Sequence, residues 1–282
     1  MILIADSGST KTNWCLLNKK GSPAFFSTAG INPFFRTSED IESELRSGLI
    51  PKLNSAVEKI FFYGAGVINE AKKNVIRTAL KRLFPATNIE IKSDLLAAAH
   101  ATLGKNPGIV CILGTGSNSG LYDGTSIVEH VSPLGFILGD EGSGAVLGKK
   151  LLADYLKGVL PEHLSKQFKI QFTTEYAEFM EHVYKKEKPN RYLAQLVPFI
   201  KQNIDDTYCK KLVENSLTEF VERNIAQYSN FKDHRISFVG SVAYHFQDQL
   251  KTLLIKQHLK LGEIEKDPIN GLIRYYQDKK LT

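Results

Sequence analysis

The first 107 residues alternate short apolar runs with stretches whose apolar residues recur every three or four positions. Runs of strand length lie at 1–7, 11–17, 23–29, 59–63 and 88–92. The clearest helical spacing lies at 69–84. Short apolar runs predict strands, and the helical spacing predicts an amphipathic helix. The chain is therefore predicted to begin with three successive strands.

Polar residues mark two further helices in this half of the chain. Ser38, followed by two acids, predicts the N-cap of a helix that runs towards residue 49. Ser93-Asp94 precede the alanine-rich segment 95–103 and predict its cap. The predicted order is three strands, then helix, strand, helix, strand and helix.

The pattern starts afresh after Asn106-Pro107-Gly108, the strongest interior break. An apolar run at 108–113 leads through a glycine and serine turn, 114–119, into a run ending at Tyr122, and a second turn leads into one ending at Val131. The strand, turn and strand of the N-terminus thus recur about a hundred residues later, as in a duplicated fold. We expect the two turns to face each other across a cleft.

Most of the remaining chain has helical spacing. It predicts a helical insert over 142–229 with breaks at 158–161 and 188–189, a strand at 235–239, a helix over 240–261 and a last helix that Pro268 starts. We expect a first domain over 1–107, a second over 108–267, and a final helix, 268–282, that packs back on the first.

Composition agrees with a soluble globular protein that has room for two domains. The 282 residues are 43% hydrophobic and 23% charged, with a net charge of +6. The positive charge permits anionic ligands, but the lysines alternate with acids, as in 184–188, and do not predict a nucleic-acid groove. No apolar stretch approaches membrane-spanning length and no basic leader precedes the first strand, so we expect a cytoplasmic protein without membrane partners.

Cysteine and histidine do not indicate a metal or redox centre. Cys15, Cys111 and Cys209 are far apart in the sequence, and the seven histidines are dispersed without a metal-binding spacing. We interpret them as packing or surface residues.

The turn after the first strand, Asp6-Ser-Gly-Ser-Thr-Lys-Thr12, has the composition of an anion-binding loop. Small residues let backbone N–H groups approach a phosphate, while the threonines add hydroxyls and the lysine a charge. A P-loop would place glycine directly before the lysine and a helix after it, so the alternative for this segment is an ordinary hairpin turn. The candidate nucleotide-binding residues are Asp6, Gly8, Ser9, Thr10, Lys11 and Thr12, and Asp6 could hold a hydrated Mg²⁺.

Further polar residues lie where strands end or helices begin: Asp94, the turn 114–119, and the segments 139–142 and 240–241. Such positions bind phosphates through N–H groups, and open α/β sheets bind ligands outside the carboxyl ends of their strands. Two such turns would suit a nucleoside triphosphate. Phosphoryl transfer needs a carboxylate near the acceptor hydroxyl, and Asp94 is the candidate general base. Its alternative role is that of a helix cap.

Asp140 and Glu141 form a second acidic pair, between two glycines. They could be a metal pair or a general acid and base, but acids in the first turn of a helix also complement its dipole. We expect one of them to contact substrate.

Together these segments resemble the superfold shared by acetate kinase, sugar kinases, Hsp70 and actin. Within it, the chain resembles the N-acetylglucosamine kinase group of the BadF/BadG/BcrA/BcrD ATPase family. Nine motifs carry the resemblance in the expected order over nearly the whole chain. They are Asp6-Ser-Gly-Ser-Thr-Lys-Thr12, Gly30-Ile-Asn-Pro33, Gly64-Ala-Gly66, Ser93-Asp94, Gly114-Thr-Gly-Ser-Asn118, Pro133-Leu-Gly135, Gly139-Asp-Glu-Gly-Ser143, Gly240-Ser-Val242 and Pro268-Ile-Asn-Gly271. The resemblance implies an α/β fold of two ribonuclease-H-like domains, the actin-like ATPase superfold, with a helical insert in the second domain.

The resemblance also implies ATP and Mg²⁺ as cofactors and gives roles to single residues. Thr10 and Thr115 would contact phosphates, and Gly240 would lie beside the adenosine. The nucleotide site would also include Gly114, Gly116 and Ser241, and the sugar site would include Asn32, Asp94, Ser117, Asn118, Leu134, Gly135 and Asp140. Ser7 and Ser9 depart from the pattern, because the related sugar kinase often has glycine there, and the last helix ends early, at Thr282.

Two functions of different classes follow from this resemblance. The first is a kinase that transfers the γ-phosphate of MgATP to an amino sugar, with the 6-hydroxyl of N-acetylglucosamine as the best single acceptor. The second is an ATP-driven activator of a 2-hydroxyacyl-CoA dehydratase or benzoyl-CoA reductase type of system. Such activators need cysteine ligands for an iron–sulfur cluster and a Gly-Gly-Gln-Asp motif, and the sequence has neither. A non-catalytic sugar sensor is a third hypothesis, and a homodimer through the helical insert is the oligomer considered.

Overall fold

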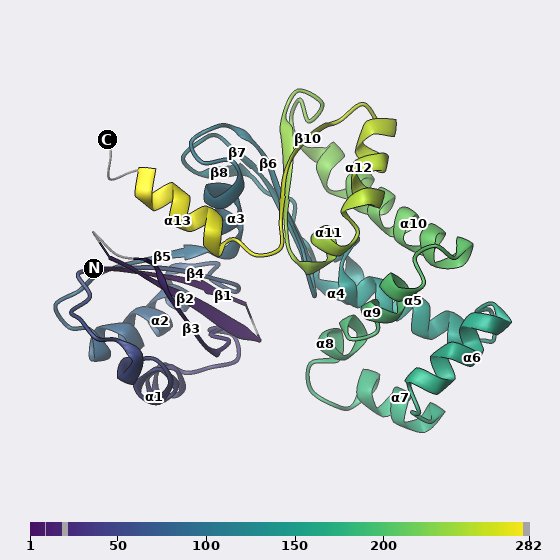
Figure 1. Ribbon diagram of the computed structural model, residues 1–282, viewed down its shortest axis with the longest axis horizontal. Helices are drawn as coiled ribbons and strands as arrows, with labels where there is room; N and C mark the ends of the chain where they lie inside the picture. The colour runs from purple at the N-terminus through teal and green to yellow at the C-terminus, as the bar shows by residue number, and fades with distance from the viewer. Residues whose placement is uncertain (9, 19–21, 279–282) are drawn as a thin grey trace. The chain divides into compact units, whose positions relative to one another are not determined.

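The computed structural model describes residues 1–8, 10–18 and 22–278 (Figure 1). The chain divides into two compact units, and each holds one five-stranded sheet. Unit 1 comprises Met1–Lys105 together with Asp267–Thr282, and unit 2 comprises Asn106–Lys266. Within the described ranges, no helix combines the length and the apolar character that crossing a bilayer requires.

The sheet of unit 1 has the strand order β3-β2-β1-β4-β5. Its strands are β1 (Ile2–Ser7), β2 (Lys11–Leu17), β3 (Ala24–Ala29), β4 (Lys59–Gly64) and β5 (Asn88–Ser93). The first three are antiparallel neighbours, and β4 and β5 run parallel to β1. The register of the β1–β2 hairpin opposes Asp6 to Asn13 and Ser7 to Thr12. All five strands predicted for this half are confirmed.

In the described part of unit 1 there are four α-helices. They are α1 (Ser38–Gly48), α2 (Glu70–Leu83), α3 (Asp94–Thr102) and α13 (Ile269–Asp278), and a 3₁₀ turn, η1 (Ile50–Lys52), follows α1. The N-cap of α1 is Thr37 and not the predicted Ser38, because Thr37 forms a capping box with Asp40. Ser93 caps α3, so Asp94 is the first residue of this helix and not its cap.

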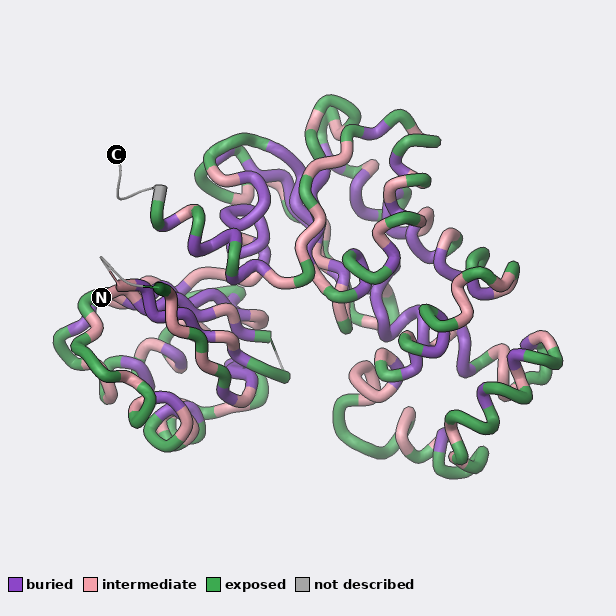
Figure 2. The backbone as a smooth tube through the Cα atoms, viewed as in Figure 1, coloured by how far each residue is buried: buried purple, intermediate pink, exposed green. Residues whose placement is uncertain are grey.

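Helices cover both faces of this sheet, which explains why its central strands are almost continuously apolar. Leu3 and Trp14 point to the face that α1 and α2 cover. The alternate residues Ile4 and Cys15 point to the face that α3 and α13 cover. β1 and β4 are buried along most of their length (Figure 2).

Helix α13 follows the last strand of unit 2 in sequence but completes the core of unit 1. Its residues Ile269 and Tyr276 join the same apolar cluster as Ile4. An added Cβ at Gly271 would lie 2.4 Å from the carbonyl oxygen of Ala101 in α3. The small residues of α3 therefore allow α13 to pack closely against it.

The sheet of unit 2 repeats that of unit 1 strand for strand, with the order β10-β9-β6-β7-β8. Its strands are β6 (Gly108–Leu113), β7 (Ser117–Tyr122), β8 (Ile127–Glu129), β9 (Arg235–Val239) and β10 (Lys260–Glu265). β6 to β8 are antiparallel neighbours, and β9 and β10 run parallel to β6. β6 to β10 therefore correspond to β1 to β5 in order and direction, as the predicted duplication requires.

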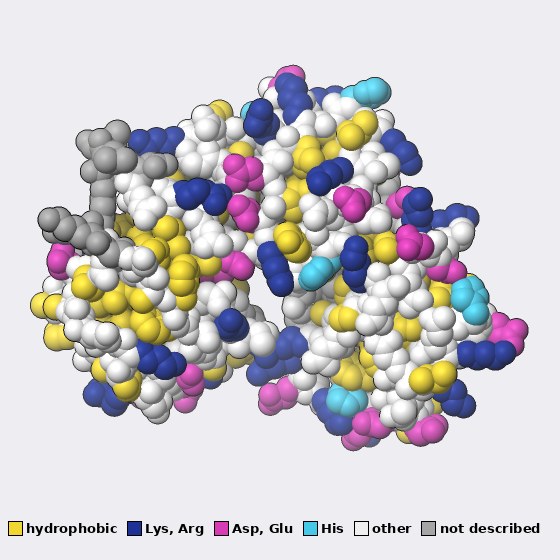
Figure 3. Space-filling view, viewed as in Figure 1, with side chains coloured by type: hydrophobic (Ala, Val, Ile, Leu, Met, Phe, Trp, Pro, Cys, Tyr) yellow, Lys and Arg dark blue, Asp and Glu magenta, His cyan; other side chains and the backbone are white. Residues whose placement is uncertain are grey.

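The chain between β8 and β9 is helical, as predicted, with more breaks than expected. The elements are α4 (Gly135–Leu138), α5 (Gly144–Leu156), α6 (Glu162–Gln171), α7 (Tyr176–Tyr184), α8 (Pro189–Ala194), α9 (Val197–Gln202), α10 (Thr207–Arg223) and η2 (Ile225–Gln227). Residues of α5 and α10 share one apolar core with β6 and β9. On the face drawn in Figure 3, lysine and arginine side chains of the described residues are interspersed with acidic ones in each unit.

The helix predicted over 240–261 is wrong in its second half. The chain forms α11 (Ser241–His245) and α12 (Gln247–Lys256) and then strand β10. His258 adopts a left-handed conformation with φ of 55°, which ends the helical path. β10 escaped prediction because Gly262 interrupts it and its register against β9 shifts, so its apolar residues do not alternate regularly.

Three predicted boundaries also move by a few residues. The turn predicted over 114–119 spans only 114–116, because β7 begins at Ser117. β8 ends at Glu129 and not at Val131. Pro268 precedes α13, and its carbonyl accepts the hydrogen bond from the N–H of Leu272.

Candidate functional site

The first candidate turn closes the β1–β2 hairpin. The N–H of Gly8 donates to the carbonyl of Lys11 at 3.0 Å. Gly8, Thr10 and Lys11 are exposed. The hairpin therefore presents small residues and an ammonium group at an accessible turn, as an anion site requires. Ser9, the remaining candidate, lies outside the described residues.

Thr12 does not present its side chain to a ligand, in contrast to the prediction. The side chain is fully buried, and its hydroxyl lies 2.7 Å from that of Ser7 and donates to the carbonyl of Ala29. Side chains alternate along a strand, and Thr12 shares the face of Trp14, which packs beneath α1 and α2. Its hydroxyl is therefore a structural group of the hairpin.

Asp6 lies at the end of β1, on the face of the sheet that α3 and α13 cover. The register places Asn13 and Tyr63 beside it on the neighbouring strands. Burial, together with the nearby carboxylates of Asp267 and Asp94, raises the pKa of Asp6 to about 7. A proton or a cation at Asp6 would relieve this repulsion.

Asp94, the candidate general base, follows β5 directly and begins α3. The N–H of Leu95 donates to its Oδ1 at 2.8 Å. Burial raises the pKa of Asp94 to about 6, although the backbone hydrogen bonds oppose this shift. A carboxylate with this pKa is ionised at neutral pH and still basic enough to accept a proton from a hydroxyl during a reaction.

Asp267 is a site residue that sequence reasoning missed. It precedes α13, and its Oδ1 accepts from the N–H of Ile269 at 3.2 Å. It lies close enough to Asp6 to raise the pKa of that carboxyl. The duplication contains the signal that could have found it, because β10 and α13 correspond to β5 and α3, which makes Asp267 the counterpart of Asp94.

Asn32 lies in the loop that follows β3 in unit 1. It is buried, and its Oδ1 accepts from the N–H of Phe34 at 3.0 Å. An added Cβ at Gly66 would lie 2.5 Å from this Oδ1, so glycine makes room for the carboxamide. The Nζ of Lys72 in α2 donates to the carbonyl of Pro33 at 2.9 Å. The loop around Asn32 is therefore built against two neighbouring segments.

The second candidate turn, 114–116, closes the β6–β7 hairpin of unit 2. The N–H of Gly114 donates to the carbonyl of Gly116 at 2.9 Å. The carbonyls of Gly114 and Thr115 accept from the N–H groups of Gly144 and Ala145, which begin α5, at 2.8 and 3.0 Å. Helix α5 thus fixes the turn, and because those two N–H groups are engaged, an anion here would be bound by the turn itself.

Asp140 packs against this second turn and is buried. Its Oδ1 accepts from the N–H of Ser117 at 3.2 Å, and an added Cβ at Gly116 would lie 3.0 Å from its Oδ2. Burial raises the pKa of Asp140. Among the described residues, the buried hydroxyl of Ser117 finds no hydrogen-bond partner. An orphaned hydroxyl beside a buried carboxylate indicates a polar ligand that completes the pairing.

Glu141 has a different environment from its neighbour Asp140. Its Oε1 lies 2.8 Å from Nε of Arg223, and the amide of Asn224 donates to its Oε2 at 3.2 Å. Both carboxylate oxygens are thus engaged by α10 and the residue after it. Of the two acids, Asp140 is the one placed at the candidate turn.

Gly240 brings the end of β9 against the end of β6. Its φ is 126°, and an added Cβ would lie 2.2 Å from the carbonyl oxygen of Leu113, the last residue of β6. No other residue type fits this approach without movement of the backbone. Ser241, which begins α11, is exposed.

The remaining sugar-site candidates lie on β7 and in the loop after β8. Oδ1 of Asn118 accepts from the N–H of Ser119 at 2.9 Å and lies 2.8 Å from Nε2 of His130, a contact that the sequence did not predict. Leu134 and Gly135 both have left-handed backbone conformations. Leu134 is 61% exposed, so the described part of unit 2 does not enclose this candidate sugar-site residue.

The donors available for a metal ion are carboxylates. Among the residues that the structure describes, no group of three or more histidine, cysteine, aspartate or glutamate side chains is arranged to hold a metal. Nucleotide-bound Mg²⁺ needs only one or two protein carboxylates, because phosphates and waters supply its other ligands. Asp6, with its excess of neighbouring negative charge, fits such an ion.

The sequence profile of the BadF/BadG/BcrA/BcrD ATPase family matches residues 5–273. The chain belongs to this family. Membership in this ATPase family implies that the chain binds ATP. None of the curated proteins matches the chain significantly.

Three solved structures are similar to this family member, and the two of lower identity show the fold alone. A candidate N-acetylglucosamine kinase from Porphyromonas gingivalis is 44% identical, with a TM-score of 0.94 and 99% of both chains covered. A candidate N-acetylglucosamine kinase from Chromobacterium violaceum is 19% identical, with a TM-score of 0.76 over 97% of this chain and 98% of that one. A ROK family glucokinase from Streptomyces griseus, in complex with glucose and AMPPNP, is 12% identical, with a TM-score of 0.57 over 97% of both chains. The predicted α/β fold of the actin-like ATPase type is confirmed.

Proposed function

We propose that this protein is an ATP-dependent kinase that transfers the γ-phosphate to the 6-hydroxyl of N-acetylglucosamine. The observation that carries the proposal is Asp94, a carboxyl at the first residue of α3 whose pKa burial raises to about 6. Such a group suits a general base for a sugar hydroxyl. The 44% identity with the candidate N-acetylglucosamine kinase from Porphyromonas gingivalis supports the choice of sugar.

Unit 1 supplies the groups that handle protons and charge in this proposal. Asp94 accepts the proton of the acceptor hydroxyl as the hydroxyl oxygen bonds to the γ-phosphorus, and the bond from that phosphorus to the β,γ-bridging oxygen breaks, so that ADP leaves. The first turn, with the Lys11 ammonium, orients the phosphates, and Asp6 would hold a hydrated Mg²⁺. When bound, Mg²⁺ would neutralise negative charge that develops on the phosphates.

Unit 2 supplies mainly binding groups. The turn 114–116, with Thr115, contacts phosphates, and Gly240 and Ser241 border the adenosine. Asp140, Ser117 and Asn118 are the groups of this unit that would hydrogen-bond the sugar. The buried and unpaired hydroxyl of Ser117 supports this assignment, because a sugar hydroxyl would satisfy it.

The activator hypothesis is not supported by the environment of the cysteines. Cys15, Cys111 and Cys209 are all buried, and burial raises the pKa of each thiol. An iron–sulfur cluster binds thiolates, which this environment disfavours. The kinase therefore remains the function that the residues favour.

The experiment that tests the proposal is phosphate transfer from MgATP to a panel of sugars, with the products identified by mass spectrometry. We expect N-acetylglucosamine to exceed glucose and glucosamine by about tenfold or more in kcat/KM, or roughly 1.4 kcal/mol of transition-state binding. A higher kcat/KM for glucosamine or N-acetylmuramic acid would leave the kinase but change its substrate. Tight sugar binding without transfer to any member of the panel would instead indicate a sensor.

A further inference from the structure

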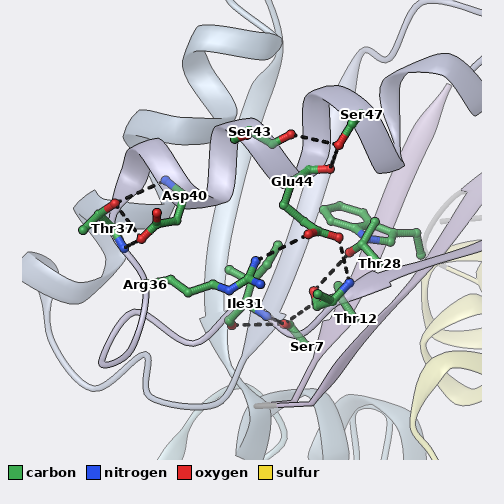
Figure 4. A network of polar contacts seen from close by, with 12 residues as sticks. Ser7, Thr12, Thr28, Ile31, Arg36, Thr37, Asp40, Ser43, Glu44 and Ser47 are labelled. Atoms are coloured by element: carbon green, nitrogen blue, oxygen red, sulfur yellow. Dashed lines mark hydrogen bonds and ion pairs between the residues drawn. The ribbon is translucent and has the colours of Figure 1, made fainter.

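A buried chain of hydroxyl groups joins the first turn of unit 1 to the loop that carries Asn32 (Figure 4). The hydroxyls of Ser7 and Thr12, opposite each other in the hairpin, lie 2.7 Å apart. The Oγ of Ser7 accepts from the N–H of Ile31 at 3.0 Å, and the hydroxyl of Thr12 donates to the carbonyl of Ala29 at 3.2 Å. Both side chains are almost completely buried.

Each hydroxyl has one proton, and two arrangements of these protons satisfy the pair. Either Ser7 donates to Thr12 and Thr12 donates to the carbonyl of Ala29, or Thr12 donates to Ser7 and Ser7 donates to the carbonyl of Ile31 at 3.0 Å. In both arrangements the Oγ of Ser7 accepts from the N–H of Ile31. The chain starts and ends on the same short segment, 29–31, and ties it to the hairpin.

The same segment is held at every backbone N–H. That of Ala29 donates to Oε1 of Glu44 in α1 at 3.0 Å, and that of Gly30 donates to the carbonyl of Thr10 in the candidate phosphate turn at 3.0 Å. Ile31 is bound through Ser7, as described above. Asn32 is the next residue. A shift of the turn that carries Thr10 therefore moves the backbone immediately before Asn32.

The far end of the Asn32 loop is anchored on the same helix. Nη1 of Arg36 lies 3.9 Å from Oε2 of Glu44, whose other oxygen binds Ala29 (Figure 4). Thr37 then caps α1. The loop between Ala29 and Thr37 is thus fixed at both ends, and its connection to the turn runs through Ser7, Thr12 and Gly30.

The β1–β2 hairpin does not require a serine side chain at position 7. Glycine at this position would remove the hydroxyl that receives the N–H of Ile31. The hairpin itself closes through backbone bonds that do not need this side chain.

We propose that Ser7 and Thr12 are positioning residues that couple the nucleotide turn to the acceptor loop. Phosphates bound at the turn hold the loop with Asn32 in its binding arrangement, and a sugar bound at Asn32 favours nucleotide binding by the same factor, because such coupling is reciprocal. The identity of the two ligands rests on the proposed function. The coupling between the turn and the loop does not depend on turnover.

A tryptophan side chain next to the segment 29–31 can report on ligand binding. Trp14 is the single tryptophan, it is fully buried, and its Nε1 donates to the hydroxyl of Thr28 at 3.0 Å. Thr28 precedes Ala29 and also donates to the Ala29 carbonyl. Tryptophan fluorescence should therefore respond to ligands at the turn and at the loop, which gives both dissociation constants without catalysis.

The experiment measures the dissociation constant of N-acetylglucosamine with and without Mg·AMPPNP in the wild type and in Ser7→Ala, Thr12→Val and Thr12→Ser. We expect the nucleotide to tighten sugar binding about fivefold or more in the wild type, within the usual range of coupling between sites. Ser7→Ala and Thr12→Val should reduce this factor to about twofold or less, and Thr12→Ser should retain it because the hydroxyl remains. Undiminished coupling in folded Ser7→Ala and Thr12→Val would overturn the proposal.

The matched control is Thr87→Val. Thr87 is also buried in unit 1 and donates its hydroxyl to a backbone carbonyl, that of Val57 at 2.8 Å, but it precedes β5 at the opposite ends of the strands from the turn. We expect Thr87→Val to keep the wild-type coupling factor. Its loss in this variant would show that the coupling responds to general destabilisation and would contradict a specific role for Ser7 and Thr12.

A second measurement works even if a variant fails to fold. Mg·AMPPNP alone should slow hydrogen exchange at the amides of Gly30 and Ile31 in the wild type, and an unchanged rate at both would overturn the proposal. This readout needs no sugar. A wild type that phosphorylates no sugar, but shows the slowed exchange, would therefore refute the proposed function and leave the coupling intact.

Discussion

The β1–β2 and β6–β7 hairpins have the same strand pairing but different side chains before their turns. In the β1–β2 hairpin the paired positions before the turn are Asp6 with Asn13 and Ser7 with Thr12. In the β6–β7 hairpin the corresponding pairs are Ile112 with Asn118 and Leu113 with Ser117. The first hairpin thus carries its own carboxylate and hydroxyls. The second has apolar residues on β6.

The second hairpin receives its carboxylate from another part of the chain. Asp140, in the loop before α5, accepts the N–H of Ser117, and the start of α5 supports the turn. The duplicated carboxyl positions, Asp94 and its counterpart Asp267, both belong to unit 1 because α13 packs there. The duplicated fold therefore has two similar turns. The carboxylates of Asp94 and Asp267 both lie near Asp6, at the end of β1.

The largest expected effect tests this asymmetry at the duplicated carboxylates. Asp94→Asn keeps an acceptor for the N–H of Leu95 but removes the base, so kcat for sugar phosphorylation should fall by about 10²-fold or more while nucleotide binding persists. Asp267→Asn, the matched variant, keeps the acceptor for the N–H of Ile269 and should reduce kcat by less than tenfold. Steady-state kinetics decide the matter, and a greater loss in Asp267→Asn would reverse the assignment of roles.

The next prediction distinguishes the roles of the neighbouring acids Asp140 and Glu141 in unit 2. Asp140→Asn should raise the KM for sugar by about tenfold, because a buried charged hydrogen-bond partner is lost. Glu141→Gln should weaken the contact with Arg223 and lower stability by about 1 kcal/mol, with kcat/KM within about threefold of the wild type. Kinetics and urea unfolding of both variants test this. Equal changes of KM in the two would remove the distinction.

A third prediction concerns the pH dependence of stability. The pKa of Asp6 is about 7 in the folded chain and ordinary, near 4, in the unfolded chain, so ionisation of Asp6 progressively destabilises the fold as the pH rises from about 4 to about 7. Asp6→Asn removes this penalty and should gain about 1–2 kcal/mol more at pH 8 than at pH 5 in EDTA. Urea unfolding at the two pH values measures it.

The control for this prediction is Asp123, whose pKa is lowered in the folded chain instead of raised. Hydrogen bonds from Ser126 and Thr125 hold the pKa of Asp123 down at about 2, so its stabilising effect is already complete above its unfolded pKa. Asp123→Asn should therefore lose the same stability at pH 5 and pH 8. A gain in Asp6→Asn that does not grow with pH would show that Asp6 ionises normally in the fold.

The smallest effect concerns the unpaired hydroxyl of unit 2. Ser117→Ala removes a buried group without a partner and should stabilise the ligand-free protein by about 0.5–1 kcal/mol. The same change should weaken sugar binding several-fold, because the ligand loses its partner. Thermal unfolding with and without sugar measures both. Ser119→Ala is the matched control, since that hydroxyl bonds to Tyr228 and its removal should destabilise the protein.

Sequence reasoning located the strands of unit 1 and the first strands of unit 2 because local patterns determine them. β1, β2 and β6 are apolar runs between clear turns, and Gly240 marks a close backbone approach that only glycine allows. The positions of Asp6 at the end of a strand and of Asp94 at the start of a helix also follow from short segments.

The remaining features depend on contacts between distant segments. Whether the side chain of Thr12 is buried depends on the register of the hairpin. A shift of one residue would turn this side chain to the other face of the sheet. The bond from Ile31 to Ser7 spans 24 residues. Asp267 could be matched to Asp94 only after β10 was known, and β10 is an irregular edge strand stabilised by its pairing with β9.

The position of α13 has a consequence for how the molecule is made. Its residues cover Ile4, Cys15 and Tyr63 on one face of the first sheet, yet on the ribosome they emerge only after the whole of unit 2 has been synthesised. Since translation proceeds at about 5–20 residues per second, the part of this apolar face that α13 covers stays exposed in the nascent chain for several seconds or more. Unit 2, which is continuous in sequence, can finish folding before the unit that precedes it, and the earliest part of the chain is the last to be completed.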